Sequence, residues 1–349
     1  MRAAKPQVQG ISEADAMAAP GGGFGADRLF IYALRNVTEA AARAAHHWAG
    51  RGDRGQGDRM AVGAMRRALE RLPIHAHIVT GEGEDEETGG LMTGSGIGDP
   101  ASAMQFDVAV DPVEGISYLA RGMTNAMAVI ALAPRGTMMD PGPSFYMEKF
   151  VAPPKAEGRI DPDMPVKDRL KALSKALEKP VSELTVFVLE KPRHRNLVEQ
   201  IHDAGARVAL YPAGDVAGAL MAATPESGID ALMGTGGTRE GLISACAIRA
   251  MGGVFQARFD PQLSTEKAAV IKAGIDTAVW RDASEMITSD RVFFSATGIT
   301  TGLLFTGVER TRWCERTQTL MIAGPMGELE LITTHHRDIE DGAKEGNDA

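Results

Sequence analysis

The order of apolar and polar positions along the chain predicts two kinds of organisation, one after the other. Short apolar runs with strand-like composition, each bounded by glycine, proline or acidic clusters, occur at 76–80, 106–110, 126–132 and 145–151. From residue 166 onward, helix-like and strand-like patterns alternate, which favours a parallel sheet covered by helices. Helices are expected at 167–177, 195–203, 215–223 and 239–251, and strands at 184–189, 207–211 and 229–233.

Two helices are expected before the first strand. The segment Asn36-Val-Thr-Glu39 has the spacing of a capping box, so it predicts a helix over 40–48. The glycine-rich stretch 50–58 predicts a loop that leads into a second helix over 59–72. Asp58 is therefore expected at the start of that second helix.

The rest of the chain predicts a division into two lobes. Strands at 292–296, 317–322 and 329–332, with a turn at 324–327, are expected to close the fold, and the proline pair 153–154 favours a lobe boundary nearby. The predicted organisation is a flexible N-terminal tail at 1–28, an α+β lobe at 29–155, an α/β lobe at 156–336 and a flexible C-terminal tail at 337–349.

Composition and charge narrow the classes of function. The chain has 349 residues, 44% of them hydrophobic and 24% charged, which is typical of a soluble globular protein, and no apolar run reaches the roughly 18 residues of a membrane span. A net charge of −9 disfavours nucleic-acid binding, which needs concentrated basic side chains. The two cysteines have no metal-type spacing and the start lacks a signal-peptide pattern, so a reducing, cytoplasmic location is expected.

Acidic side chains follow two of the predicted strands. Glu82 follows the strand at 76–80, and Asp111 and Glu114 follow the strand at 106–110. We expect Pro112 to end the pairing of that strand and the next glycine to allow a tight turn. Hard cations such as Mg²⁺ and Mn²⁺ prefer oxygen ligands, and two-metal phosphoryl-transfer sites need several carboxylates from separate elements.

Two further acids belong to the same candidate set. Glu240 lies in a glycine-rich strand-to-helix turn, and Asp58 is expected at a helix start. Solvated turns and helix dipoles also favour acids at such positions, so each segment alone has an ordinary explanation. The set as a whole predicts a site for divalent cations.

Nine motifs in order resemble the class II fructose-1,6-bisphosphatases, including the bifunctional fructose/sedoheptulose bisphosphatases. They are Val37-Thr-Glu-Ala, Gly50-Arg-Gly-Asp, Gly81-Glu-Gly-Glu, Val110-Asp-Pro-Val-Glu-Gly, Tyr146-Met-Glu-Lys, Lys191-Pro-Arg-His, Gly214-Asp-Val-Ala, Gly237-Thr-Arg-Glu-Gly and Phe294-Ser-Ala-Thr-Gly-Ile. The resemblance covers 37–336 and implies the layered α/β/α/β/α fold of the lithium-sensitive sugar-phosphatase superfamily, an α/β fold with two lobes. It also implies hydrolysis of the 1-phosphate of fructose 1,6-bisphosphate with Mg²⁺ or Mn²⁺. A homo-oligomer, a dimer or a tetramer, is expected.

Carried over position by position, the resemblance implies roles for individual residues. The implied metal ligands are Asp58, Glu82, Asp111, Glu114 and Glu240, and Asp58 and Glu82 would share one metal and act in catalysis. The implied substrate-binding residues are Glu114, Gly115, Ile116, Tyr146, Lys191, Pro192, Arg193, Ala213, Gly214, Asp215 and Gly237. Lys191 and Arg193 follow a predicted strand, where an α/β sheet presents its ligand and arginine can bind phosphate through two bonds. A solvated basic turn is the alternative.

Three positions depart from the family pattern. The family has a threonine whose hydroxyl helps to position or deprotonate the attacking water, but this chain has Ile116, which cannot form a hydrogen bond. Losing such a group commonly costs about 10²–10⁴ in rate, and Ser117 could replace it if the turn shifts in register. Ala213 stands where the family usually has an acid. Arg59 replaces the usual glycine beside the metal-binding aspartate, where it could compete with metal, contact phosphate or face solvent.

These departures leave two alternatives to the phosphatase hypothesis. Ile116 and Ala213 are compatible with a catalytically weakened relative that binds metal or sugar phosphate in a regulatory or structural role. The change at Ala213 is also compatible with another substrate, such as sedoheptulose 1,7-bisphosphate or another small phosphate ester.

Overall fold

The computed structural model describes residues 22–83, 90–324 and 328–337. Its helices are α2 (Gly22–His46), α3 (Arg54–Leu69), α4 (Ile116–Arg121), α5 (Val166–Leu177), α6 (Arg195–Asp203), α7 (Asp215–Ala223), α8 (Thr238–Met251), α9 (Ser264–Lys272) and α10 (Ala283–Met286), with 3₁₀ turns η1 (Pro154–Ala156), η2 (Val181–Glu183) and η3 (Pro192–His194). Its strands are β1 (His75–Thr80), β2 (Gly96–Gly98), β3 (Gln105–Glu114), β4 (Met127–Pro134), β5 (Tyr146–Ala152), β6 (Thr185–Leu189), β7 (Arg207–Tyr211), β8 (Ala231–Gly237), β9 (Val254–Phe259), β10 (Arg281–Asp282), β11 (Phe293–Gly298), β12 (Glu309–Arg310), β13 (Glu315–Ala323) and β14 (Glu328–His336).

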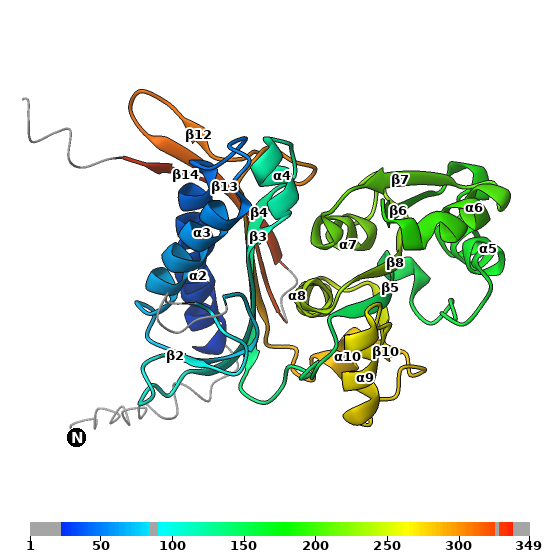
Figure 1. Cartoon of the computed structure of the whole chain (residues 1–349), viewed down its shortest axis with the longest axis horizontal. Coiled ribbons are helices and arrows are strands. Elements are labelled where there is room, and N and C mark those ends of the chain that lie inside the picture. Colours follow the sequence, from blue (N-terminus) through cyan, green and yellow to red (C-terminus); the bar gives the residue numbers. More distant parts are fainter. Residues whose placement is uncertain (1–21, 84–89, 325–327, 338–349) are drawn as a thin grey trace, which may run out of the picture.

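Helices and sheets alternate in five layers. Helices α2 and α3 cover the outer face of one sheet, α7 and α8 lie between the two sheets, and α5 and α6 cover the far face of the second sheet (Figure 1). Three hydrophobic clusters fill the four spaces between these layers. The middle cluster contains most of α7 and α8 and packs against both sheets. The predicted α/β fold with α/β/α/β/α layers is confirmed.

Both sheets are mixed rather than parallel. The first sheet has the order β12-β13-β11-β4-β3-β1-β2 with β14 on β13, and the second has the order β10-β9-β5-β8-β6-β7. In the second sheet only β6 pairs in parallel with its neighbours β7 and β8. The prediction of a parallel sheet was therefore correct for β6, β7 and β8 and wrong for the rest of this sheet. Strand β5, from much earlier in the chain, lies between β8 and β9 and is antiparallel to both.

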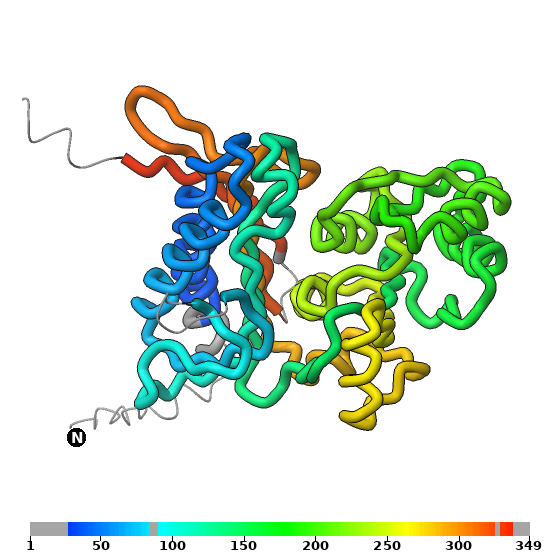
Figure 2. Tube along the Cα trace, in the orientation of Figure 1, coloured from blue at the N-terminus to red at the C-terminus, as the bar shows by residue number. Residues whose placement is uncertain are grey.

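The chain enters the second sheet and returns to the first. Strand β5 belongs to the second sheet, whereas β11, β13 and β14 pair in the first sheet. In Figure 2 the orange and red C-terminal segments accordingly run beside the blue and cyan N-terminal ones. The ranges 29–155 and 156–336 therefore do not coincide with the two sheets, because strand pairing joins segments that are distant in sequence.

The first helix is much longer than the capping-box pattern predicted. Asn36 lies inside α2 instead of capping a helix. The buried Thr38 forms 2.8 Å hydrogen bonds with Ser295 and Thr297 of β11, and Glu39 is 2% exposed. Thr38 and Glu39 of this motif therefore face the sheet, whereas Asn36 is exposed. Residues 22–28 of the predicted tail at 1–28 are helical, while 1–21 and 338–349 lie outside the described residues, as do 325–327 of the predicted turn.

The second helix begins earlier than expected. Asp53 is its N-cap and accepts a 2.9 Å hydrogen bond from the backbone N–H of Gln56. Asp58 consequently lies more than one turn inside α3, not at its start. Gly57 is helical, and a Cβ atom there would approach Leu119 of α4 to 2.9 Å. This glycine therefore serves close helix packing instead of loop flexibility.

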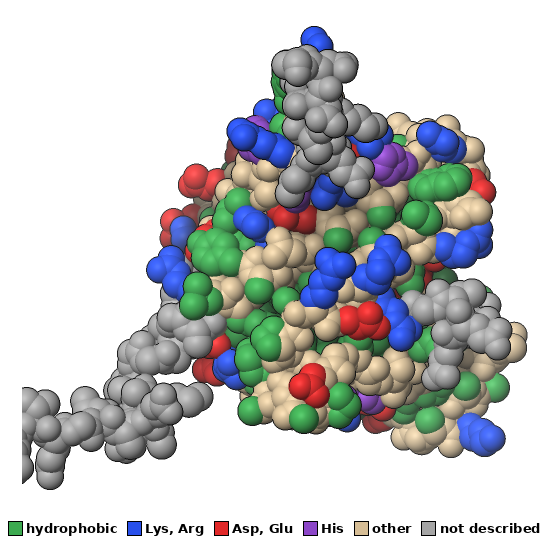
Figure 3. Space-filling model, turned by 90° about the vertical axis from the view of Figure 1, so that its left-hand side faces the viewer, with side chains coloured by type: hydrophobic (Ala, Val, Ile, Leu, Met, Phe, Trp, Pro, Cys, Tyr) green, Lys and Arg blue, Asp and Glu red, His purple; other side chains and the backbone are tan. Residues whose placement is uncertain are grey.

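The outer face of the α2 and α3 layer carries a mixed surface. Figure 3 shows basic, acidic and hydrophobic side chains interspersed over this face. Among the described residues, none of the helices is long and apolar enough to cross a membrane. Cys246 is buried and Cys314 is partly exposed, and both are free thiols.

Replacing either of two helical glycines by alanine should have opposite effects on stability. In Gly218→Ala the new Cβ would lie 2.6 Å from the buried ring of Phe187, so we expect a loss of about 1–3 kcal/mol of stability. In Gly63→Ala the Cβ meets only the mobile end of Arg67 at 3.2 Å, so we expect a gain of about 0.5–1 kcal/mol. Thermal unfolding measures both, and a stable Gly218→Ala variant would contradict the packing described here.

Candidate active site

A cleft of about 820 Å³ lies where loops and element ends from both sheets meet. Most of the residues predicted for the site line it: Glu82, Asp111, Glu114, Gly115, Ile116, Ser117, Tyr146, Lys191, Arg193, Ala213, Gly214, Asp215, Gly237 and Glu240. Two predicted residues do not. Asp58 belongs to α3, where the charge of Glu82 acts on it, and Pro192 lines a neighbouring cavity of about 510 Å³.

A β-bulge in β3 brings Asp111 and Glu114 to the same face. Strand pairing continues past Pro112, contrary to the expectation that this proline would end the ladder. Asp111 pairs with Val129 and Glu114 with Met127, so β3 has one extra residue between these pairs. Side chains alternate along a strand, and one extra residue puts positions three apart on one side. Both carboxylates therefore point into the cleft.

Helices α7 and α8 begin at the cleft and supply two more carboxylates. Asp215 is the first residue of α7, and Glu240 lies in the first turn of α8. A Cβ atom at Gly236 would collide with the Asp215 carboxylate, and one at Gly237 with the Glu240 carboxylate. These two glycines let the acids pack directly against the backbone, close to helix N-termini that favour negative charge.

Lys149 of β5 is a buried counter-charge that the sequence analysis did not identify. It is 2% exposed, forms an ion pair with Asp215 and donates a 2.9 Å hydrogen bond to the carbonyl of Gly237. The only sequence signal was its place in a strand motif that starts with Tyr146. Because its partners lie 66 and 88 residues away, no local pattern indicates the pairing.

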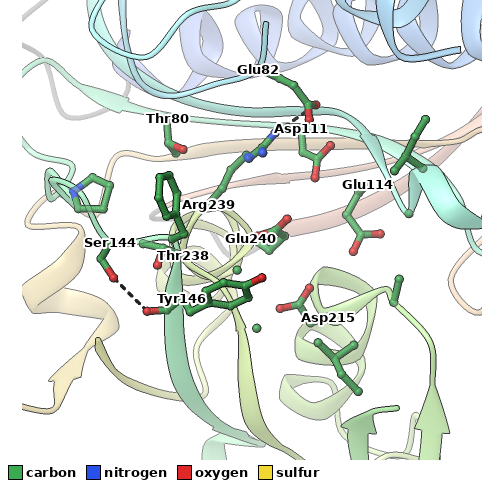
Figure 4. A pocket seen from close by; sticks show the side chains of 18 of the residues that line it. Thr80, Glu82, Asp111, Glu114, Ser144, Tyr146, Asp215, Thr238, Arg239 and Glu240 are labelled. Carbon is green, nitrogen blue, oxygen red and sulfur yellow. Dashed lines mark hydrogen bonds and ion pairs between the residues drawn. The ribbon is translucent and has the colours of Figure 1, made fainter. Parts of the chain in front are cut away.

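Arg239, the second residue of α8, is the other cation that sequence analysis missed. Its Nη1 lies 3.1 Å from Oε2 of Glu82. In Figure 4 the guanidinium points toward Glu82 and Asp111. Burial acts to lower the pKa of Arg239, but the charges of Asp111, Glu82 and Glu240 outweigh it and raise the pKa. The arginine therefore stays charged among these acids.

The crowded carboxylates resist ionisation. Burial, and then the charge of Glu82, raises the pKa of Asp58 to about 6. Burial raises the pKa of Asp111, which is 5% exposed, and of Glu114, which is 2% exposed, well above their usual values, with neighbouring acids adding to the effect. Glu240 keeps some exposure to the cleft, but burial and the charge of Asp215 raise its pKa too. Lys149 and Arg239 therefore supply less positive charge than these acids require.

The carboxylates of the cleft suit a hard divalent cation, although they do not lie close enough together to bind one in this arrangement. Oε2 of Glu114 is buried and has no hydrogen-bond partner within the described part of the chain. All the candidate ligands are carboxylates, the oxygen donors that Mg²⁺ and Mn²⁺ prefer. Over residues 22–83, 90–324 and 328–337, however, no three acidic, histidine or cysteine side chains are grouped closely enough to hold an ion as they stand. Binding would require these side chains to move together.

The opposite side of the cleft is aromatic and basic. The guanidinium of Arg193 lies 5.0 Å from the ring centre of Tyr146, and its Nη2 donates a 2.8 Å hydrogen bond to the carbonyl of Thr235. Glu266 of α9, 1% exposed, accepts hydrogen bonds of 2.6 and 2.9 Å from the backbone N–H groups of Phe145 and Tyr146. Glu266 thereby anchors the start of β5, and sequence analysis gave no sign of it.

Two of the three positions that depart from the family pattern lie at α4: Ile116 is its first residue, and Ala213 contacts it through Tyr118. Gly115 caps α4 with φ of 86°, and Ile116 and Ser117 are the first two helical residues, both lining the cleft. Ile116 and Ala213 also pack against the outer hydrophobic cluster. The hydroxyl of Tyr118 donates to the carbonyl of Ala213 and accepts from its N–H, both at 2.9 Å, so the backbone of this segment is fixed without an acidic side chain.

The raised pKa of Asp58 predicts a pH effect in the metal-free protein. A carboxyl with pKa raised by folding from 3.8 to about 6 favours the folded state below pH 3.8, and that advantage is lost as pH rises through 6. In the presence of a chelator, the melting temperature of the wild type should therefore fall relative to that of Asp58→Asn between about pH 4 and pH 7. Parallel pH curves for the two proteins would contradict this.

Comparison with known proteins agrees with the motifs. The family described as "Bacterial fructose-1,6-bisphosphatase, glpX-encoded" matches residues 28–336. The "Fructose-1,6-bisphosphatase 1 class 2" of Escherichia coli K12 is 39% identical over 313 residues, which cover 86% of this chain and 93% of the relative. The class 2 enzymes of Escherichia coli O6:H1 and Shigella flexneri match to the same extent. The resemblance is confirmed, and the chain belongs to the bacterial, glpX-encoded fructose-1,6-bisphosphatase family.

Proposed function

We propose that the chain hydrolyses the 1-phosphate of fructose 1,6-bisphosphate to give fructose 6-phosphate and phosphate. The observation that carries the proposal is the cleft in which Asp111, Glu114 and Glu240 face Lys191 and Arg193, in a chain whose family match covers 28–336. A cation-binding set opposite basic side chains is the arrangement that a phosphate ester requires. A cytoplasmic location and a homo-oligomeric state remain predictions.

Membership of the family implies a divalent metal cofactor, and we propose Mg²⁺ or Mn²⁺. The proposed ligands are Asp58, Glu82, Asp111, Glu114 and Glu240. When bound, such cations neutralise phosphate oxygens and make a water molecule more acidic. Burial and the negative charge of neighbouring acids raise the pKa values of Asp58, Asp111, Glu114 and Glu240, and the cations would compensate that negative charge.

The chain's own basic groups would hold the phosphates. A guanidinium has five N–H groups, and Arg193 gives two of them to the carbonyl of Thr235, so the others can donate to phosphate oxygens. Lys191 lines the same wall of the cleft. The N-termini of α7 and α8 also face the cleft and favour a bound anion. Together with Tyr146 these groups would orient the sugar bisphosphate.

Proton transfer would involve the pair Asp58 and Glu82 and the hydroxyl of Ser117. In the metal-free protein Asp58 has a pKa of about 6, raised by burial and by the charge of Glu82, so its carboxylate can take up a proton near neutral pH. Ile116 cannot take part, but Ser117 is the next residue of α4 and also lines the cleft. The water oxygen forms a bond to phosphorus, and the bond from phosphorus to the oxygen on C1 breaks.

A catalytically weakened relative is the second candidate function, and Ile116 is the observation that favours it. An aliphatic side chain occupies the first position of α4 at the cleft. Ala213, which contributes only backbone polar groups, similarly favours a phosphatase for sedoheptulose 1,7-bisphosphate or another small ester.

Replacing one acid without changing its shape tests the enzyme hypothesis. With Mn²⁺ or Mg²⁺ present, Glu114→Gln should release phosphate from fructose 1,6-bisphosphate at least about 100-fold more slowly than the wild type, because a charged ligand is lost. The exposed Glu183→Gln is the matched control and should keep wild-type activity. A chelator should stop the wild-type reaction, and persistent turnover in its presence would contradict a metal-dependent mechanism.

Substitutions at the start of α4 identify the hydroxyl. If Ser117 supplies it, Ser117→Ala should lower kcat by about 10² or more, and Ile116→Thr should restore much of that loss in the double variant. A different pattern would favour the weakened relative: a silent wild type, an unaffected Ser117→Ala and turnover only in Ile116→Thr. Activity toward another phosphate ester alone would show that the substrate differs.

A further inference from the structure

The two cations among the acids of the cleft are held in different ways. Lys149 is hydrogen bonded both to Asp215 and to a backbone carbonyl and is almost fully buried, so its charge is fixed in place. Arg239 is 27% exposed, and its Nη1 approaches Oε2 of Glu82 to 3.1 Å. Neither of these two atoms makes a hydrogen bond within the described residues, although both are buried. Arg239 therefore contributes charge with little directional bonding.

Arg239 also acts on acids from three different elements. The charges that raise its pKa are those of Asp111 on β3, of Glu82 after β1 and of Glu240 on α8. These are three of the five proposed metal ligands. Its guanidinium points toward Glu82 and Asp111 (Figure 4), so it lies at the oxygens that a divalent cation would need.

We propose that Arg239 is a built-in counter-ion of the metal-free site, and that a divalent cation binds by displacing its guanidinium from Glu82 and Asp111. This inference rests on the proposed metal site. The single positive charge of Arg239 cannot balance the negative charges of Glu82, Asp111 and Glu240, whereas divalent cations supply more positive charge. The long side chain, on the first turn of α8 beside a cleft of about 820 Å³, has room to move away.

If a cation must displace the Arg239 guanidinium, the affinity of the site for metal is lower than the affinity that the carboxylate ligands alone would give. The apparent dissociation constant rises in inverse proportion to the fraction of molecules in which the site is open. Removing the guanidinium should therefore tighten metal binding. A residue that merely supports the ligands would have the opposite effect, because its loss would disorder them.

Direct binding of Mn²⁺ to the full-length, chelator-treated protein, measured by isothermal titration calorimetry, tests the proposal without any need for activity. Arg239→Met should lower the dissociation constant for Mn²⁺ at least about tenfold relative to the wild type. Arg207→Met is the matched control because it removes the same charge from an exposed side chain that does not line the cleft. It should change the constant by no more than about twofold.

A second variant covers the case in which Arg239→Met does not fold, as judged by circular dichroism. Arg239→Lys keeps the charge but loses the planar fork, so it should bind Mn²⁺ more tightly than the wild type and less tightly than Arg239→Met. Unchanged or weaker binding in the folded variants, or equal tightening in Arg207→Met, would overturn the inference while leaving the proposed function intact. A wild type that binds no Mn²⁺ would overturn the proposed metal site itself.

Discussion

The mutual repulsion of buried carboxylates is the constraint on which the rest of the site depends. Asp111 and Glu114 are almost fully buried, and burial together with the charge of neighbouring acids raises the pKa values of Glu240 and Asp58. Keeping several negative charges out of water is unfavourable unless positive charge is nearby. Arg239 and Lys149 supply part of it, and the family's divalent metal would supply the rest.

The fold brings these charges together by local devices on separate layers. The bulge in β3 turns Asp111 and Glu114 to one face, and Gly236 and Gly237 let two helix-borne acids lie against the strand before α8. Because the acids come from the first sheet and from the helices between the sheets, the cleft exists only when all these layers are packed. Stability and site geometry are therefore linked through the middle hydrophobic cluster.

Much of this arrangement could be predicted from the sequence, but only where the signal was local. The boundaries of α6, β7 and α7 follow from periodicity, and the acids after two strands indicated the cleft. The spacing of Asp111 and Glu114 was informative although its cause was a bulge, not the strand end expected at Pro112. The motif at residues 36–39 has the spacing of a helix cap, yet it lies inside a long helix, where Thr38 contacts β11 and Glu39 contacts β13.

What sequence analysis missed depends on contacts between distant segments. Nothing near Lys149 indicates that Asp215 will neutralise it, nothing near Glu266 indicates that it holds the start of β5, and the insertion of β5 between β8 and β9 has no local signature. The most direct test of the account is a crystal soaked in Mn²⁺, with the ions located by anomalous scattering. The account predicts peaks about 2 Å from carboxylate oxygens of Asp111, Glu114 and Glu240. Anomalous peaks found only elsewhere, with no ion bound to these three acids, would contradict it.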